Sequence, residues 1–379
     1  MFSLLLAALQ VAAGPAWAQT APTAGVAGAL QPFVDSQTLA GAVLLVASKD
    51  KVLSLEAVGY ADVAAKKPMQ TDCLFWIASQ WKPITAAGLM MLVDEGKVSI
   101  DDPVEKYLPE FKGQWVRAEH DKDHVLLKRP KHPITVKNLL THTSGLPFKS
   151  AIEEPTLDLF PLSLRVRSYA MLPLDFEPDT RYQYSNAGIN AAGRIIEVVS
   201  HMPYEQFLDK RLFQPLGMKD TTFWPTAEQL TRLAKAYGPT ADKKGLQETT
   251  IGQLKYPLDD HCRQPMPAGG LFSTATDLSL FYRMIAGGGA LAGKRCLSEQ
   301  AVQQMTSKQT GDLPTAYGFA FSTGGGRIGH GGAYSTNSTY DQKRQLITIF
   351  LVQHAGWPNE GGGKILPTFE QAALKAFAK

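Results

Sequence analysis

The sequence predicts an α/β (α+β) protein in which an antiparallel sheet, built from both ends of the chain, is flanked by helices and carries an inserted helical domain. Three observations lead to this prediction. β-rich segments lie near both ends of the chain, and helix-like segments separated by Pro- and Gly-containing loops fill the middle. The composition, 44% hydrophobic and 19% charged residues, is typical of a compact globular protein.

The first β-rich segment is GAVLLVASKDKVLSLEAVGYAD, residues 41–62. Two apolar runs flank the turn Ser48-Lys49-Asp50-Lys51, a pattern that predicts a β-hairpin. The segments NAAGRIIEVVS and YEQFLDKRLF, in the middle of the chain, favour helices. We therefore expect a mainly helical insertion over residues 96–261.

The second β-rich region includes YGFAFS, the turn GGGRIGHGG, TNSTYDQ and QLITIFLVQ, and a helix-like segment follows from about residue 365. We expect residues 30–95 and 262–379 to form the α/β domain together. A cleft between this domain and the helical insertion is the expected place for a ligand.

The N-terminal segment has the features of an export signal. Residues 1–18 contain an uncharged apolar core followed by the small-x-small triplet Ala16-Trp17-Ala18, but no basic start. We expect a signal peptide over residues 1–18, cleavage near Ala18, and a periplasmic or secreted protein. A short buried helix is the alternative. No later segment approaches the ~20 apolar residues of a membrane span.

Charge and cysteine content exclude several classes. A net charge of +3 without a Lys/Arg run interleaved with aromatics argues against nucleic acid as a partner. The odd number of cysteines, at Cys73, Cys262 and Cys296, leaves at least one thiol unpaired, and no Cys-x-x-Cys spacing points to a metal.

The first candidate catalytic motif is Ser79-x-x-Lys82, in LFWIASQWKPITAAGLMMLVDEGK. Pro83 is tolerated only in the first turn of a helix, so the helix should begin near Ser79, with both side chains on one face. A nearby lysine of lowered pKa can take the proton of a serine nucleophile. Ser48 and Lys51 repeat the spacing by chance in a predicted turn, so the spacing alone is weak evidence.

Two further motifs follow. In Tyr184-Ser185-Asn186, the phenol can relay a proton, and Asn186 can bind substrate or orient the lysine. In HGGA, the residues His330, Gly331 and Gly332 would let a substrate lie against a strand. The N–H groups of Ala333 and Ser79 are a plausible oxyanion hole.

Taken in order, Ser-x-x-Lys, Tyr-x-Asn and a basic residue followed by a small residue and Gly resemble the motif set of the serine β-lactamase and penicillin-binding superfamily. The chain looks most like the branch of class C β-lactamases, D-alanyl-D-alanine carboxypeptidases, D-aminopeptidases and family VIII carboxylesterases. VDEGKVSIDDPVEKYLPEF, ITVKNLLTHTSGLPF and PAGGLFSTATDLSLF extend the resemblance over residues 30–379.

The resemblance implies a β-lactamase/transpeptidase-like fold and hydrolysis of an ester, amide or lactam carbonyl through an acyl-enzyme. Ser79 would be the nucleophile, Lys82 and Tyr184 the proton-transfer pair, and the backbone of Ser79 and Ala333 the oxyanion hole. Asn186 and His330 match the substrate side of the site. The implied substrate is a small molecule or peptide, and no metal or cofactor is required.

One departure affects the expected substrate. Gly331 stands where lactamases and carboxypeptidases usually carry Thr or Ser, whose hydroxyl helps to hold a carboxylate. A histidine at 330 in place of Lys is mostly neutral at pH 7. An esterase or D-peptidase therefore fits better than a class C-like β-lactamase, and Trp81, beside the nucleophile, is expected to narrow the acyl pocket.

Other readings remain as alternatives. HGGA resembles the oxyanion loop of lipase-like α/β-hydrolases, but no G-x-S-x-G follows it. His120 and His124, near Asp121 and Asp123, have the spacing of zinc ligands on a helix, but the segment is highly charged and favours a solvated loop. His142 fits a buried structural histidine. A penicillin- or peptidoglycan-binding module without turnover is the non-enzymatic alternative.

Overall fold

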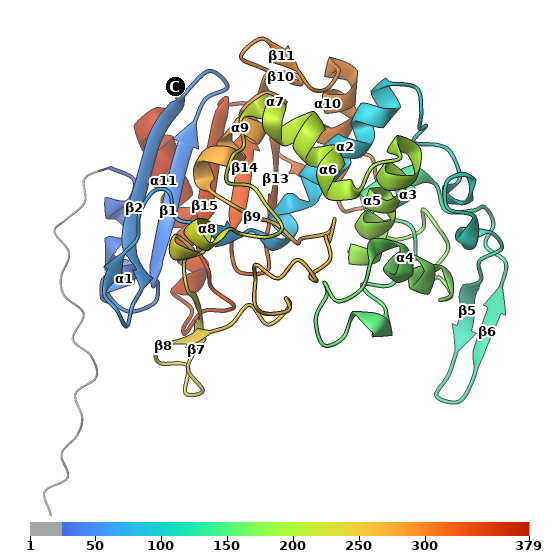
Figure 1. The fold of residues 1–379 in the computed structure, drawn as a ribbon, viewed down its shortest axis with the longest axis horizontal. Coiled ribbons are helices and arrows are strands. Elements are labelled where there is room, and N and C mark those ends of the chain that lie inside the picture. The colour runs from blue at the N-terminus through green and yellow to red at the C-terminus, as the bar shows by residue number, and fades with distance from the viewer. Residues whose placement is uncertain (1–24, 379) are drawn as a thin grey trace, which may run out of the picture.

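The computed structural model describes residues 25–378, so the predicted signal peptide lies outside the described residues. Strands from both ends of the chain form one sheet, and most of the helices of the middle segment lie beside it (Figure 1). The predicted fold class, an antiparallel sheet flanked by helices, is confirmed.

The main sheet has seven strands in the order β12-β13-β14-β15-β1-β2-β3, and every neighbouring pair is antiparallel. The hairpin predicted from residues 41–62 joins β1 to β2 through the turn at Ser48, whose Oγ accepts the N–H of Lys51. The strands are β1 (Gly41–Ala47), β2 (Val52–Asp62), β3 (Lys67–Pro68), β12 (Ser322–Gly324), β13 (Arg327–Gly331), β14 (Asn337–Asp341) and β15 (Leu346–Leu351).

Strand β1, in the interior of the sheet, is buried on both faces, which explains its uninterrupted apolar sequence. Val43 and Leu45 pack in the core shared with the helices α2 (Lys82–Asp94) and α9 (Ala275–Ala286). Leu44, which points the other way, packs with residues of α1 (Gln31–Asp35) and α11 (Gly362–Phe377). The sheet therefore has helices on both faces, as in Figure 1.

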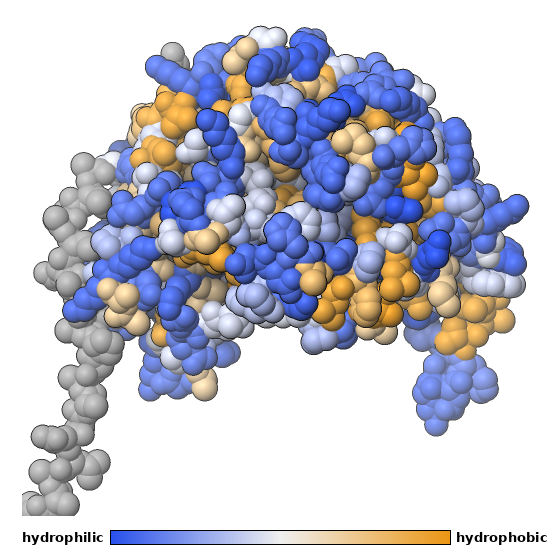
Figure 2. All heavy atoms as spheres, viewed as in Figure 1, coloured by the Kyte–Doolittle hydropathy of each residue, from blue (hydrophilic) through white to orange (hydrophobic). Residues whose placement is uncertain are grey.

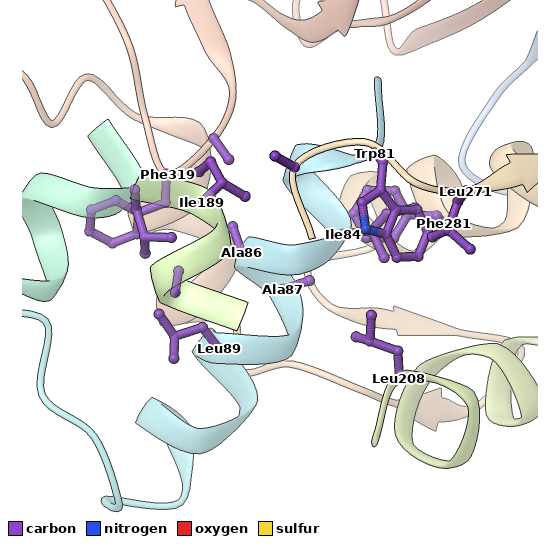
Figure 3. Packing of buried hydrophobic residues seen from close by; sticks show 14 of the residues in the cluster. Trp81, Ile84, Ala86, Ala87, Leu89, Ile189, Leu208, Leu271, Phe281 and Phe319 are labelled. Carbon is purple, nitrogen blue, oxygen red and sulfur yellow. The ribbon is translucent and has the colours of Figure 1, made fainter. Parts of the chain in front are cut away.

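Helix α2 runs through the middle of the protein. A short 3₁₀ turn, Ala78–Trp81, precedes it, and Pro83 lies in its first turn, where the missing N–H costs nothing. Figure 3 shows Trp81 and Ile84 beside Leu271 and Phe281, whereas Ala86 and Leu89 point toward another group of core residues. Since its sides are covered, the helix is a rigid support for the residues at its N-terminus.

Residues 96–261 contain most of the remaining helices, and the exact limits of the predicted inserted domain stay a prediction. These helices are α3 (Val136–Thr141), α4 (Leu162–Ala170), α5 (Asn186–Ser200), α6 (Tyr204–Leu208), a π-helical turn Asp209–Phe213, α7 (Gln214–Leu216) and α8 (Ala227–Thr231). Helix α10 (Glu299–Thr306) follows later in the chain. Short strand pairs are β4 (Phe75–Trp76) with β9 (Phe272–Ser273), β5 (Val116–His120) with β6 (Val125–Lys128), β7 (Ala236–Pro239) with β8 (Leu246–Thr249), and β10 (Ala290–Leu291) with β11 (Lys294–Arg295).

The β5–β6 hairpin projects from the body of the protein (Figure 1). It carries His120 and His124, so the charged segment forms an exposed hairpin rather than a helix with paired ligands. Hydrophilic side chains predominate on the face seen in Figure 2, with hydrophobic patches between them. Within residues 25–378, no helix has both the length and the apolar character required to cross a bilayer.

Candidate active site

Ser79 lies in a tight turn between β4 and α2. Ala78, immediately before it, adopts φ = 46°, a left-handed conformation that a non-glycine residue holds only when its surroundings enforce it. The surroundings here include Trp76, whose backbone N–H donates to Gln353 (2.9 Å) and whose indole N–H donates to the carbonyl of Gly269 (2.8 Å). Ser79 is partly exposed, whereas both of its neighbours are buried. The turn therefore presents the hydroxyl to solvent.

Lys82 is the partner of this hydroxyl. Its side chain is 0% exposed, and Nζ donates hydrogen bonds to Oγ of Ser79 (2.7 Å) and to the carbonyl of Ala268 (2.6 Å). No carboxylate pairs with Lys82 in the described part of the chain. Burial without a counter-charge holds the pKa of Lys82 well below its usual range. The lowered pKa favours the neutral amine, which is the form that can act as a base.

Tyr184 completes the proton-transfer group. Nζ of Lys82 lies 4.8 Å from the centre of its ring, and its hydroxyl hydrogen-bonds to Ser79. Burial raises the pKa of Tyr184 above its usual range, and the bond to Ser79 offsets part of this effect. The phenol thus stays protonated at neutral pH and can donate its proton to a leaving group, while Lys82 serves as the base.

The ring of His142 packs against the ring of Tyr184. Its ring centre lies 4.5 Å from that of Tyr184, and its Nδ1 accepts the backbone N–H of Ser185 (3.2 Å). The Ser185 hydroxyl in turn caps α5 by accepting the N–H of Gly188. His142 is 1% exposed, so it is the buried structural histidine expected from the sequence, but it also positions the motif that carries Tyr184.

The end of β13 packs against the nucleophile turn. A Cβ on Gly332 would lie 2.4 Å from the carbonyl oxygen of Ile77, so only glycine allows this approach. Ala333 is exposed, and its N–H makes no hydrogen bond within residues 25–378. An N–H that is free and close to the turn of Ser79 suits an oxyanion hole, which stays a prediction.

The structure corrects the expected role of His330. Nδ1 lies 2.6 Å from the carbonyl oxygen of Gly331, and Nε2 lies 3.0 Å from the hydroxyl of Tyr317. Because a carbonyl only accepts, Nδ1 carries the proton and Tyr317 donates to Nε2. Burial, with a smaller effect of the Lys82 charge, lowers the pKa of His330 to about 3. Both nitrogens are occupied, so the ring offers no N–H to a substrate.

Asn186 and Gly331 are two further residues predicted on the substrate side. Oδ1 of Asn186 is buried at the start of α5 and has no hydrogen-bond partner among the described residues. Gly331 is partly exposed, and a Cβ placed on it would meet nothing nearer than Asn337 and Thr336, at 3.5 Å. The missing side chain at position 331 therefore leaves accessible space.

The expectation that Trp81 narrows an acyl pocket is wrong. Trp81 is 0% exposed, and its indole N–H donates to the hydroxyl of Tyr204 (3.0 Å) on α6. Its ring packs edge-on against Phe213, with 5.5 Å between ring centres. It points into the core while Ser79, two residues earlier, points outward, because consecutive residues of a helical turn face different directions.

Three residues that support this site were not predicted from the sequence. These are Tyr317, the carbonyl of Ala268 and Asn190, which accepts the N–H of Ala268 (3.0 Å). The only available signal was the placement of Asn190 one helical turn after Asn186. In the described part of the chain, no three His, Cys, Asp or Glu residues are grouped so that they could hold a metal ion. The three thiols are free.

Comparison with known proteins gives a consistent result. Residues 26–372 match the family model described as Beta-lactamase. An uncharacterized protein of Mycobacterium tuberculosis is 31% identical over 368 residues, covering 87% of this chain and 90% of its own. Esterase EstB of Burkholderia gladioli is 35% identical over 198 residues, 49% of this chain and 47% of its own.

Among solved structures, EstCE1, a hydrolase with promiscuous acyltransferase activity, superposes with a TM-score of 0.75 at 25% identity. The match covers 92% of this chain and 97% of EstCE1. The family model spans nearly the whole described chain, and within it Ser79, Lys82 and Tyr184 form the serine–lysine–tyrosine group of the site. The chain belongs to the Beta-lactamase family and is a serine hydrolase of the esterase or peptidase type.

Proposed function

We propose that this protein is a serine esterase that acts on esters of uncharged acyl groups. The observation that carries the proposal is the enclosure of His330, both of whose ring nitrogens are bonded to Tyr317 and Gly331. His330 is neutral, the pKa of Lys82 is lowered by burial, and position 331 has no hydroxyl, so these positions offer little to hold a substrate carboxylate. Burying an unpaired carboxylate costs several kcal/mol, so charged acyl groups are disfavoured.

The aromatic surroundings of the serine support the same substrate class. Phe148, which is 45% exposed, stacks on Tyr184 with 6.3 Å between ring centres, and Tyr182 packs edge-on against His142 with 5.8 Å between ring centres. Such surfaces favour apolar acyl or alcohol groups. The names of the relatives Esterase EstB and EstCE1 agree with this proposal.

In the proposed reaction, Lys82 and Tyr184 transfer protons both when the acyl-enzyme forms and when water hydrolyses it. Lys82 takes the proton of the Ser79 hydroxyl while Oγ attacks the ester carbonyl, and the tetrahedral intermediate forms with its negative oxygen toward the predicted N–H donors. Tyr184 donates its proton to the departing alkoxide and recovers one from Lys82, which leaves an acyl-enzyme and a free alcohol. Water then attacks the acyl-enzyme, with the same groups moving its protons, and releases the acid.

A matched pair of esters tests the proposal. p-Nitrophenyl butyrate and the p-nitrophenyl monoester of succinate share the leaving group and the chain length but differ in one carboxylate. We expect kcat/KM for the butyrate to be higher by about 100-fold or more, and Ser79→Ala to abolish both reactions. Comparable rates on the two esters, or faster serine-dependent turnover of a chromogenic cephalosporin, would contradict it. No turnover, despite labelling of Ser79 by a fluorophosphonate, would favour a binding module.

Hydrolysis of D-residue peptides is the second candidate. Oδ1 of Asn186 is a buried acceptor without a partner, and an amide substrate has an N–H to donate there, whereas an ester has none. If this candidate is right, Asn186→Leu should lower turnover of a D-alanyl p-nitroanilide more than turnover of p-nitrophenyl butyrate. Equal losses on the two substrates would argue against it.

We also propose that the protein is exported to the periplasm or the medium. The apolar run and the Ala16-Trp17-Ala18 triplet support this proposal. N-terminal sequencing of protein purified from the host's periplasmic or culture fraction should begin near residue 19. Recovery of the uncleaved chain from the cytoplasm alone would contradict it.

A further inference from the structure

A chain of buried hydrogen bonds leads away from the amine of Lys82. Nζ donates to the carbonyl of Ala268 (2.6 Å), and the N–H of Ala268 donates to Oδ1 of Asn190 (3.0 Å). Nδ2 of Asn190 donates to the hydroxyl of Tyr169 (2.9 Å). Asn190 is 0% exposed and lies on α5. The residue that supplies the acceptor for Lys82 is therefore itself held by a side-chain amide.

The orientation of this amide is determined by its partners. The Tyr169 hydroxyl donates to Oε1 of Glu153 (2.7 Å), so it can only accept from Asn190. Nδ2 of Asn190 therefore faces Tyr169, and Oδ1 faces Ala268. Glu153 is also fixed, because Oε2 accepts the backbone N–H of Ser150 (2.9 Å). A fully satisfied buried network of this kind holds one geometry.

Other side chains anchor the same loop but at different residues. The Thr85 hydroxyl donates to the carbonyl of Pro267 (2.6 Å), and the indole N–H of Trp76 donates to that of Gly269 (2.8 Å). Between these anchors, Asn190 is the one side chain of the described structure that bonds to the N–H of Ala268. It therefore controls the residue whose carbonyl faces Lys82.

We propose that Asn190 is a positioning residue, which holds the Ala268 carbonyl against Lys82 and so aligns the amine with the hydroxyl of Ser79. Asn190 acts through Ala268 and does not contact Lys82. The proposal rests on the serine–lysine chemistry of the site and not on the preference for uncharged esters. Loss of the Asn190 side chain should therefore affect the rate of acylation rather than substrate binding.

The variant Asn190→Leu tests the role, because leucine has a similar volume and makes neither hydrogen bond. We expect kcat for p-nitrophenyl butyrate to fall about 10- to 100-fold, with KM within about twofold of wild type. The acid limb of the rate–pH profile should move to lower pH, because a carbonyl acceptor stabilises the ammonium form of Lys82 more than the amine. The pH dependence of fluorophosphonate labelling should change in the same way.

Thr85→Val is the matched control, since it removes an anchor of the same loop at Pro267 and leaves Ala268 bonded. It should lower the melting temperature without moving the acid limb. Tyr169→Phe removes the hydroxyl that orients the amide and bonds to Glu153, but it leaves Asn190 itself in place, so a smaller loss of kcat with the same direction of pH shift is expected. This variant decides the question if Asn190→Leu does not fold.

Two results would overturn the proposal. One is a folded Asn190→Leu, or in its place Tyr169→Phe, with wild-type kcat and an unmoved acid limb. The other is a raised KM at constant kcat, which would put Asn190 on the substrate side. Fluorophosphonate labelling requires no particular acyl group, so it tests Asn190 even if uncharged esters prove not to be the substrates.

Discussion

Nζ of Lys82 and Oγ of Ser79 lie 2.7 Å apart at the first turn of a buried helix, and burial holds the pKa of the lysine amine well below its usual range. We expect Lys82→Met to lower kcat/KM by about 10³-fold, because the serine loses its base. Because the pKa of Lys82 is lower in the folded chain than in the unfolded chain, where it is about 10.4, unfolding takes up a proton and wild-type stability from this group increases with pH. The melting temperature of Lys82→Met, relative to that of wild type, should therefore be higher at pH 7 than at pH 10. An equal difference at both pH values would contradict a lowered pKa.

Tyr184→Phe tests the proton donor while keeping the ring contacts with His142 and Phe148. We expect kcat to fall about 100-fold, since a positioned acid contributes 10²- to 10⁴-fold. Tyr182→Phe is the matched control, because burial raises the pKa of Tyr182 to about 12 in the same aromatic group but no bond to Ser79 accompanies it. That variant should stay within about threefold of wild type. Equal losses in the two variants would assign the effect to packing.

Gly331→Thr should restore part of the recognition of carboxylates. The new Cβ fits, with its nearest neighbours at 3.5 Å, and the hydroxyl supplies a hydrogen bond to a charged group. The kcat/KM ratio of the succinyl to the butyryl ester should rise about tenfold, as one such bond predicts. In Gly332→Ala, the Cβ would lie 2.2 Å from Oγ1 of Thr336, so this variant should lose activity on both esters. An unchanged kcat/KM ratio in Gly331→Thr would mean that the substrate does not bind beside the end of β13.

Buried neutral histidines make the fold sensitive to acid. Burial lowers the pKa of His330 and of His354 to about 3, and that of His142 well below its usual range. These groups bind protons only on unfolding below about pH 6.5, so stability is fully present above that pH and is lost as the pH falls. Burial raises the pKa of Asp277 to about 6, so this carboxyl releases a proton on unfolding near pH 5. This release cancels the proton uptake of about one of the three histidines.

The net effect near pH 5 is about two protons taken up on unfolding, or about 3 kcal/mol per pH unit. Chemical denaturation at pH 7, 6 and 5 checks this prediction. His354→Gln, outside the active site, should reduce the slope by about half, because it removes one of the two net protons. A free energy of unfolding that stays constant between pH 7 and pH 5 would contradict it.

The parts of the site that follow from local sequence were accessible without the structure. Ser79 and Lys82 meet because three residues in a helical turn bring side chains to one face, and Pro83 marks where that turn begins. The strands of the sheet were equally accessible, since β1 and β15 are continuous apolar runs.

The roles of His330 and Trp81 depend on contacts that no spacing encodes. The carbonyl of Gly331 sets the tautomer of His330, and Tyr317, from outside the strand, occupies the other ring nitrogen. Trp81 turns inward, where Tyr204 on α6 accepts its N–H. Likewise, Asn190 gains its place through Ala268, 78 residues away in the chain. Such partners follow from the tertiary packing of segments that are remote in sequence.

The pairing of β1 with β15 has a consequence for when the enzyme becomes active. The turn of Ser79 is held by late residues: Gln353 accepts the N–H of Trp76, and Thr336 donates to the carbonyl of Ile77. A growing chain on the ribosome contains the nucleophile, its base and its proton donor long before these late residues emerge. A chain that stops before Thr336 lacks both of these hydrogen bonds, so we expect it not to hold Ser79 in the active arrangement.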